Sequence, residues 1–421
     1  MKLSRLERWL LAAIVVQLLV GLVWLTTYNW FGATPVHGIA FDRRGMPLGN
    51  DFAAFWFAAK MALGRPAADT YDLVAMTQFQ HGIWPDLVGV YAWVYPPSFL
   101  LLVLGLGLLP YYVGYLVWIV STLGVFFAGL WQNVRSRTSW WLIIAFPGLW
   151  LGIGQGQNQF LTAGLGALGI GLLRKHPVWA GVCIGLLAIK PHLALLFPVA
   201  LLAARAWRTI VAAAVTAITV TLVPAAILGW NTLTAWTQSM AWVSTAIQQK
   251  RLPVWMFPAP YPWLISLHVP ATLAWVVQGG VSVGVAIVVY RMWRPLAGAA
   301  LRDAAPLRGD APQGTGLSLV LPASALVLAT FLATPYYAMY DLAWLALPLC
   351  WLVANGMDRG WRRGEKPLLV LVFLLPYASV IALAVDVQIA PFVLAGLLWH
   401  VWQRSVSDRN GAPADRTLAV L

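Results

Sequence analysis

Long apolar segments recur along almost the whole chain, from Leu10 to Val401, and no long polar tract separates them. An α-helix needs about 20 apolar residues to cross the hydrocarbon core of a bilayer. Hydrophobic residues make up 61% of the 421 positions and charged residues only 10%, against roughly 25% charged in a soluble domain. The sequence therefore predicts an all-α polytopic membrane protein, a single membrane-embedded domain over residues 1–421.

Basic residues predict how the helices are oriented, because loops rich in Lys and Arg stay in the cytoplasm. The apolar run at 9–27 follows Lys2, Arg5 and Arg8 and has no cleavage site, so we expect an uncleaved first helix with a cytoplasmic N-terminus. The other candidate cytoplasmic loops are basic segments at 135–137, 174–175, 205–208, 291–308 and 358–366. This arrangement predicts about twelve crossings of the cytoplasmic (inner) membrane. The C-terminus is then cytoplasmic, with residues 403–421 as a flexible tail.

Two longer segments are expected to face the exterior. Residues 28–95 are too rich in Gly, Pro and charge for hydrocarbon, and one helix face is predicted within them by the spacing of Phe52, Phe55, Trp56, Ala59 and Leu63. We expect an interfacial helix there and a second short helix at 72–80. Residues 230–262 form the second exterior loop. Between 95 and 131, Pro110 divides an apolar stretch into two pieces, one of which can be re-entrant or interfacial rather than spanning.

Composition and motifs argue against several other classes of protein. The net charge is +13, but the basic residues do not form the clustered patch of a nucleic-acid-binding surface, so no nucleic-acid partner is expected. The histidines lack metal-binding spacing, Cys183 and Cys350 lie in apolar runs, and no phosphate or dinucleotide loop is present. We expect no cofactor and no protein-built metal site, although Asp51 and Asp72 could share a divalent ion.

Asp51 lies near the start of the segment GNDFAAFWFAAKMALG at 49–64, in a chain with only 14 acidic residues. A carboxylate at the start of a helix can be an N-cap, a role that Asp favours strongly. It can also be a functional group whose ionised form the helix dipole stabilises. Both interpretations stay open, and they are compatible with each other.

Cations next to apolar helices form a second group of candidates. Lys190 stands in AIKPHLALLFP, and Lys250 and Arg251 precede LPVW. A charge at the end of a membrane helix is costly and often functional, but a long basic side chain can also reach out to lipid headgroups. Asp341, in ATPYYAMYDLAWLALP, needs a partner, and Lys190 or Arg251 could form that ion pair.

Neutral polar groups complete the set of candidates. Gln157 and Asn158, in GIGQGQNQF at 152–160, must be hydrogen-bonded or hydrated inside a membrane protein. A glycine-rich turn is the alternative explanation for that segment. Tyr340 precedes Asp341, at a place where an aromatic belt at the membrane interface would equally explain a tyrosine.

Several segments, taken in order, resemble glycosyltransferase family 87. They are GNDFAAFWFAA, YDL at 71–73, YPPSFLLLVLGLGLLP at 95–110, GQGQN at 154–158, KPH at 190–192 and TPYYAMYDL at 334–342. The resemblance implies a bundle of membrane helices of the GT-C type whose first exterior loop carries a catalytic aspartate. It also implies a polyprenyl phosphate-sugar donor, with mannose as the sugar in characterised members, and inversion at the anomeric carbon.

Carried over to this sequence, the resemblance implies a role for each candidate residue. Asp51 matches the first-loop aspartate and would accept the proton of the acceptor hydroxyl. The phosphate of the donor would be stabilised by Lys190, Arg251 and Lys250. The sugar- or acceptor-binding residues would be Gln157, Asn158, Tyr340 and Asp341. A structural role for Asp341 is the alternative.

The expected function is inverting transfer of a hexose, mannose by resemblance, from polyprenyl phosphate to a lipid or glycan acceptor on the exterior face of the membrane. The expected partners are that donor, that acceptor and membrane lipids. A transporter or flippase of a lipid-linked or anionic solute is the alternative from another class. Transporters commonly show internal repeats with matching broken helices, whereas the long loops of the two halves do not correspond here. That difference favours the enzyme.

Overall fold

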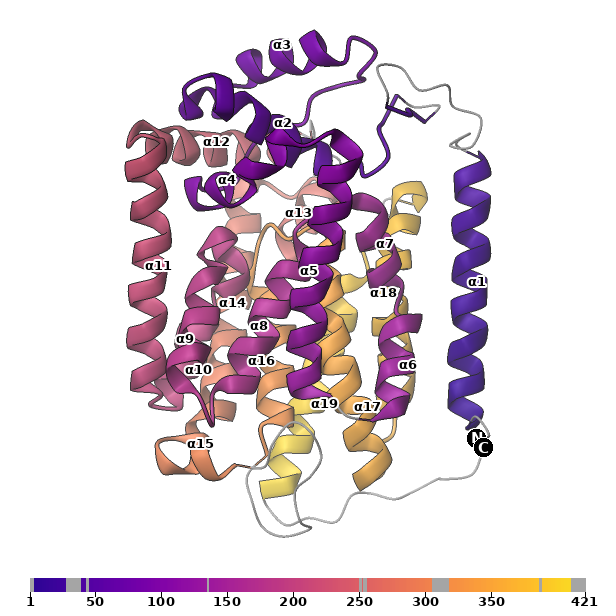
Figure 1. The fold of residues 1–421 in the computed structure, drawn as a ribbon. Coiled ribbons are helices and arrows are strands. Elements are labelled where there is room, and N and C mark those ends of the chain that lie inside the picture. Colours follow the sequence, from indigo (N-terminus) through magenta and orange to yellow (C-terminus); the bar gives the residue numbers. More distant parts are fainter. Residues whose placement is uncertain are drawn as a thin grey trace.

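The computed structural model describes residues 4–27, 39–42, 45–134, 136–249, 252, 256–304, 318–385 and 388–409. These residues form helices, and the one extended pairing among them is a single bridge between Phe41 and Pro47. The prediction of an all-α protein is confirmed. Figure 1 shows a bundle of roughly parallel and antiparallel helices with several short helices gathered at one end.

The helices follow one another in this order: α1 (Arg5–Thr27), α2 (Phe52–Gly64), α3 (Leu73–Ile83), α4 (Pro97–Val103), α5 (Tyr111–Asn133), α6 (Arg137–Ala145), α7 (Pro147–Gln155), α8 (Gln159–Leu172), α9 (Pro177–Leu186) and α10 (Phe197–Ala203). The second half holds α11 (Trp207–Leu228), α12 (Asn231–Gln248), α13 (Pro260–Ser266), α14 (Ala271–Trp293), α15 (Ala299–Asp303), α16 (Val320–Ala333), α17 (Ala346–Arg359), α18 (Glu365–Val385) and α19 (Ala390–Arg409). The short 3-10 segments used below are η1 (Ala67–Tyr71), η2 (Leu104–Leu108), η3 (Leu187–Ile189), η4 (Pro191–Ala194) and η7 (Met339–Leu345).

Four helices in the described part of the chain are long and apolar enough to cross a bilayer, which indicates a membrane protein. They are α1, α5, α11 and α14. Six further apolar helical segments in the described part have only 10–17 residues, so the predicted count of twelve crossings is not confirmed. One reason why the helices are short is seen at Lys190, where η3 and η4 separate α9 from α10. Pro191 has no backbone N–H to donate within a continuous helix.

The short helices α2, α3, α4 and α12 lie together at one end of the bundle, and α15 lies at the other (Figure 1). The two segments expected to form exterior loops, 28–95 and 230–262, therefore contribute helices to the same end. Around Pro110, α4 and η2 pack against α2, whereas α5 is long enough to span. The piece before Pro110 is thus the one that does not cross.

The helix expected at the membrane interface differs from its prediction in how it is buried. α2 has the predicted bounds, but its residues are buried on every face from Phe52 to Ala59, and Lys60 and Leu63 are exposed. Trp56 stacks on Trp84, and its indole N–H donates to Leu109 O at 2.9 Å. Because η1, α3, α4 and η2 all pack around it, α2 lies at the centre of this group of short helices and does not have a solvent-exposed face along its first turns.

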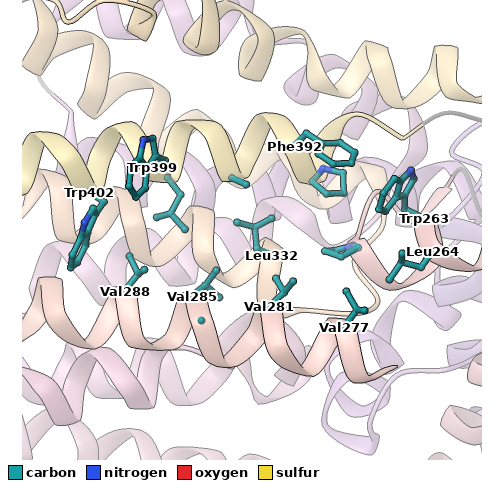
Figure 2. A pocket seen from close by; sticks show the side chains of 15 residues that line it. Trp263, Leu264, Val277, Val281, Val285, Val288, Leu332, Phe392, Trp399 and Trp402 are labelled. Carbon is teal, nitrogen blue, oxygen red and sulfur yellow. The ribbon is translucent and has the colours of Figure 1, made fainter. Parts of the chain in front are cut away.

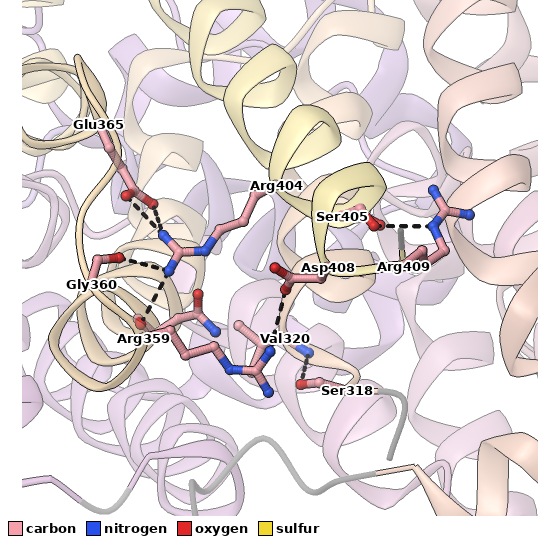
Figure 3. A network of polar contacts seen from close by, with 10 residues as sticks. Ser318, Val320, Arg359, Gly360, Glu365, Arg404, Ser405, Asp408 and Arg409 are labelled. Carbon is pink, nitrogen blue, oxygen red and sulfur yellow. Dashed lines mark hydrogen bonds and ion pairs between the residues drawn. The ribbon is translucent and has the colours of Figure 1, made fainter. Parts of the chain in front are cut away.

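The opposite end of the bundle is held by polar contacts of the last helix (Figure 3). Arg404 is buried and donates from Nη1 to both carboxylate oxygens of Glu365 at 2.8 Å, while its Nη2 donates to Gly360 O. Residues 403–409, predicted to begin a flexible tail, are instead the last turns of α19, because this ion pair anchors them. Residues 410–421 lie outside the described part of the chain.

Candidate active site

Asp51 immediately precedes α2, and its side chain makes no hydrogen bond to the N–H groups of that helix. The Asp51 side chain therefore does not cap α2. The backbone N–H of Asp51 donates to Gln155 O at 2.9 Å, which fastens the start of α2 to the end of α7. Asp51 keeps part of its surface exposed, whereas the residues after it are buried. The backbone at Asp51 is thus fixed in place, while the residue as a whole is only partly buried.

The turn after α7 brings two amide side chains to this carboxylate. Gly156 ends α7 with a φ of +73°, a conformation that glycine adopts without strain. A Cβ on Gly156 would lie 2.7 Å from the Cβ of Phe52, so the turn closes directly on α2. Gln157 and Asn158 follow and are both buried. The glycine-rich turn and the candidate binding site are therefore the same structure.

Gln157 joins Asp51 to a tyrosine that sequence reasoning did not single out. Its Oε1 accepts a hydrogen bond from the Tyr95 hydroxyl at 2.7 Å, and its amide interacts with the Asp51 carboxylate. Tyr95 is buried and begins the segment YPPSFLLLVLGLGLLP. Its position before two prolines was visible in the sequence, but nothing there indicated contact with a residue 62 positions away.

Lys190 occupies the centre of the polar cluster on the other side of the turn. Its Nζ donates to Asp341 Oδ1 at 2.6 Å and to Asn158 Oδ1 at 3.1 Å, and lies 4.7 Å from the ring centroid of Tyr340. Lys190 is 4% exposed and Asp341 is fully buried, so this ion pair is shielded from water. A snorkelling lysine is excluded by this geometry, because the ammonium points into the protein.

Asp341 uses both of its oxygens within the protein. Oδ1 receives Lys190, and Oδ2 accepts from the backbone N–H of Ala338 at 3.1 Å. The predicted pairing of Asp341 with Lys190 is confirmed. The other candidate cations, Lys250 and Arg251, lie outside the described residues.

The surroundings of Asp51 change its acidity. Burial raises the pKa of the Asp51 carboxyl from 3.8 to about 6, since few water molecules solvate the anion, and the nearby Asp341 charge adds to this shift. The Gln157 amide and the positive charge of Lys190 act in the opposite direction and favour the carboxylate. A pKa near 6 suits a group that must accept a proton near neutral pH.

No group of three or more His, Cys, Asp or Glu side chains that could hold a metal ion is found among the described residues. Asp72, named with Asp51 as a possible ion ligand, is an exposed N-cap. Its Oδ1 accepts from the N–H groups of Val74 and Ala75 at the start of α3.

An apolar groove of about 470 Å³ lies beside the segment that leads into η7. It lies between α14 and α19 with α13 at one end, and the labelled side chains of Figure 2 include Trp263, Val281, Leu332, Phe392 and Trp402. At the α13 end, the ring of Tyr261 lies 5.8 Å from that of Tyr336, and the Tyr337 hydroxyl donates to Pro258 O. These contacts join the α13 end of the groove to Tyr336 and Tyr337, which precede Tyr340 and Asp341 in the chain.

A model of glycosyltransferase family 87 matches residues 93–307, which is half of the chain, and the protein belongs to this family. The matched region contains Tyr95, Gln157, Asn158 and Lys190, while Asp51 and Asp341 lie outside it. Comparisons with curated proteins and with solved structures found no match. The family membership identifies the protein as a glycosyltransferase, and the geometry above is the basis for assigning its residues.

Proposed function

We propose that the protein transfers a hexose, mannose by family resemblance, from a polyprenyl phosphate donor to a lipid or glycan acceptor, with inversion at the anomeric carbon. The transfer takes place at the end of the bundle that carries α2 and α12, on the exterior face of the cytoplasmic membrane. The observation that carries the proposal is that the turn after α7 joins Asp51 to the buried cationic cluster around Lys190.

In this reaction the acceptor oxygen attacks the anomeric carbon while the bond from that carbon to the phosphate oxygen breaks. The acceptor hydroxyl loses its proton, and Asp51 is the group that receives it. Gln157 orients the carboxylate of Asp51. The amide oxygen of Gln157 accepts from Tyr95, which leaves the amide N–H groups of Gln157 for Asp51. Asp51 is therefore the catalytic base and Gln157 its positioning residue.

The leaving group is a phosphate that carries negative charge, so it needs donors rather than an acid. Lys190 has three N–H donors and uses two of them on Asp341 and Asn158, which leaves one for a phosphate oxygen. Asp341 acts by holding the ammonium in place and does not contact the sugar. Tyr340, packed over Lys190, completes the donor side of the site.

The apolar groove supports a donor with a long lipid chain. Its lining is aromatic and aliphatic, and it ends at α13, next to the segment that carries Tyr340 and Asp341. An isoprenoid chain in this groove would place its phosphate toward the Lys190 cluster, whereas a nucleotide sugar has no apolar part to fill it.

The test is the choice of donor by the purified full-length protein. Polyprenyl phosphate-mannose and GDP-mannose, each with a radiolabelled sugar, are incubated with the protein and a lipid extract that supplies acceptors. Labelled product from the polyprenyl donor alone supports the proposal. Equal or greater product from the nucleotide sugar contradicts the lipid donor, and movement of intact donor across a liposome membrane without transfer contradicts the enzyme.

A further inference from the structure

A second pocket of about 460 Å³, lined by both polar and apolar side chains, opens at the end of the bundle that carries α2 and α12. It lies between the segment 68–73, the segment 92–94 and one face of α12. Its volume is within the range of small-ligand sites, roughly 300–1,000 Å³. The pocket is separate from the apolar groove and shares no lining residue with it.

The lining combines carboxylates with indole rings. Asp69 and Asp72 contribute carboxylates, Gln238 on α12 contributes an amide, and the partly exposed Trp242 contributes aromatic surface, with the buried Trp93 behind it in the wall. The Asp69 side chain has no hydrogen-bond partner within the described residues, and Asp72 uses only Oδ1 to cap α3. Hydroxyl groups donate strongly to free carboxylate oxygens, and aromatic faces accommodate the C–H surface of a sugar ring.

No Lys or Arg is found among the described residues that line this pocket. An anionic ligand would meet two carboxylates without a compensating cation, and like charges brought together at a binding site cost several kcal/mol. The side chains that line the pocket therefore favour a neutral ligand rich in hydroxyl groups.

The pocket shares a wall with the proposed active site. The Trp93 ring lies 5.2 Å from the ring of Tyr95, and the Tyr71 hydroxyl donates to Tyr95 O at 2.9 Å. Tyr95 in turn donates to Gln157, the neighbour of Asp51. A sugar in the pocket is therefore near the reaction centre, but the buried Trp93 separates it from Asp51.

We infer that this pocket binds a neutral sugar unit of the acceptor, remote from the hydroxyl that reacts. The inference rests on the proposed function, because it assigns a further binding site to the acceptor of that reaction. Asp69 is the residue on which it depends most directly, since its carboxylate makes no hydrogen bond or ion pair with another described residue.

The test measures binding without transfer. The full-length Asp51→Asn protein, without donor, is titrated with mannotriose and with trigalacturonate, and the dissociation constants are obtained by saturation-transfer NMR. We expect mannotriose to bind and trigalacturonate to bind at least tenfold more weakly. Adding Asp69→Ala should weaken mannotriose binding about tenfold, the effect of losing one hydrogen bond to a charged group. Adding Asp86→Ala, an exposed carboxylate of the same segment outside the pocket, should leave it unchanged.

Equal affinity with and without Asp69→Ala would overturn the inference, as would the absence of mannotriose binding or equally tight binding of trigalacturonate. The unfolding temperatures of the variants show whether each remains folded. Failure of the proposed function is distinguishable, because it is read from sugar transfer by the wild-type protein, which this titration does not use.

Discussion

Lys190 Nζ lies 2.6 Å from Asp341 Oδ1, inside the protein and across 151 positions of the sequence. A charge taken out of water is tolerated when it is paired and hydrogen-bonded, and removal of one partner leaves the other unpaired. The pair therefore joins η7 to the break between α9 and α10 and fixes the position of the ammonium.

We expect Asp341→Asn to lower the free energy of unfolding by about 3–5 kcal/mol, because the buried Lys190 then lacks its counter-charge. The double variant Lys190→Met with Asp341→Leu should regain much of that stability, since no charge remains buried, while sugar transfer stays low. Thermal unfolding in detergent measures both. A double variant as unstable as Asp341→Asn would show that the pair is not the cause.

The pH dependence of catalysis follows from the environment of Asp51. The base acts as its anion, and burial raises the pKa of Asp51 to about 6. We expect kcat/KM to rise about tenfold per pH unit below pH 6 and to level off above it. Asp86→Asn, at an exposed carboxylate outside both pockets, should keep the same profile. An acid limb near pH 4, the ordinary range of an aspartate, would contradict this prediction.

The same raised pKa predicts how stability varies with pH. Protonation of Asp51 is favoured by the fold, so its contribution to stability is complete below about pH 4 and is lost as the pH rises through about 6. Asp51→Asn should therefore unfold at a higher temperature than wild type at pH 7.5, with a smaller difference at pH 4. A variant less stable than wild type at pH 7.5 would contradict the sign.

Gly156 should tolerate no side chain. Gly156→Ala places a Cβ against Phe52 and Tyr115 at a φ of +73°, and we expect a loss of about 2 kcal/mol or more. Transfer should also fall, because the turn positions Gln157. Gly154→Ala, in the helix that Gly156 ends, is the matched control. A Cβ at Gly154 has no neighbouring atom within 4 Å, so this change should be close to neutral. Equal effects on unfolding temperature would refute the role of the turn.

The far end of the bundle offers a test that separates stability from catalysis. Arg404→Ala leaves Glu365 buried and unpaired, and should cost about 3–5 kcal/mol. Arg359→Ala removes an exposed pair with Asp408 and should cost at most about 1 kcal/mol. Neither change should alter KM for the donor, because both pairs involve the ends of α17 and α19 that lie opposite the α2 end of the bundle (Figure 1). A raised KM would mean that this end takes part in donor binding.

The sequence predicted that the protein is a bundle of apolar helices better than it predicted the length and the burial of each helix. The apolar run at 9–27 predicted α1, since that signal is local, whereas the sequence left open which of the two pieces around Pro110 crosses, and the structure shows that α5 is the one long enough to span. The spacing of apolar residues in α2 predicted one buried face. It could not show that the other faces are buried too, because these faces are covered by neighbouring elements of the fold.

Part of the candidate site could be predicted because unusual residues in apolar surroundings need partners. That argument found Lys190 and Asp341 and suggested their pairing. Tyr95 was missed because a tyrosine near a membrane interface has an ordinary explanation, and its contact with Gln157 depends on how α4 and the turn after α7 are brought together. Lys250 and Arg251 remain predictions of the sequence.

The most direct measurement of the central claim is the rate of mannose transfer from polyprenyl phosphate-mannose by wild type, Asp51→Asn and the control Asp86→Asn. Loss of the base should lower kcat by about 10²–10⁴-fold, while Asp86→Asn keeps the wild-type rate. Asp51→Asn that is folded and transfers sugar within a few-fold of wild type would contradict Asp51 as the catalytic base.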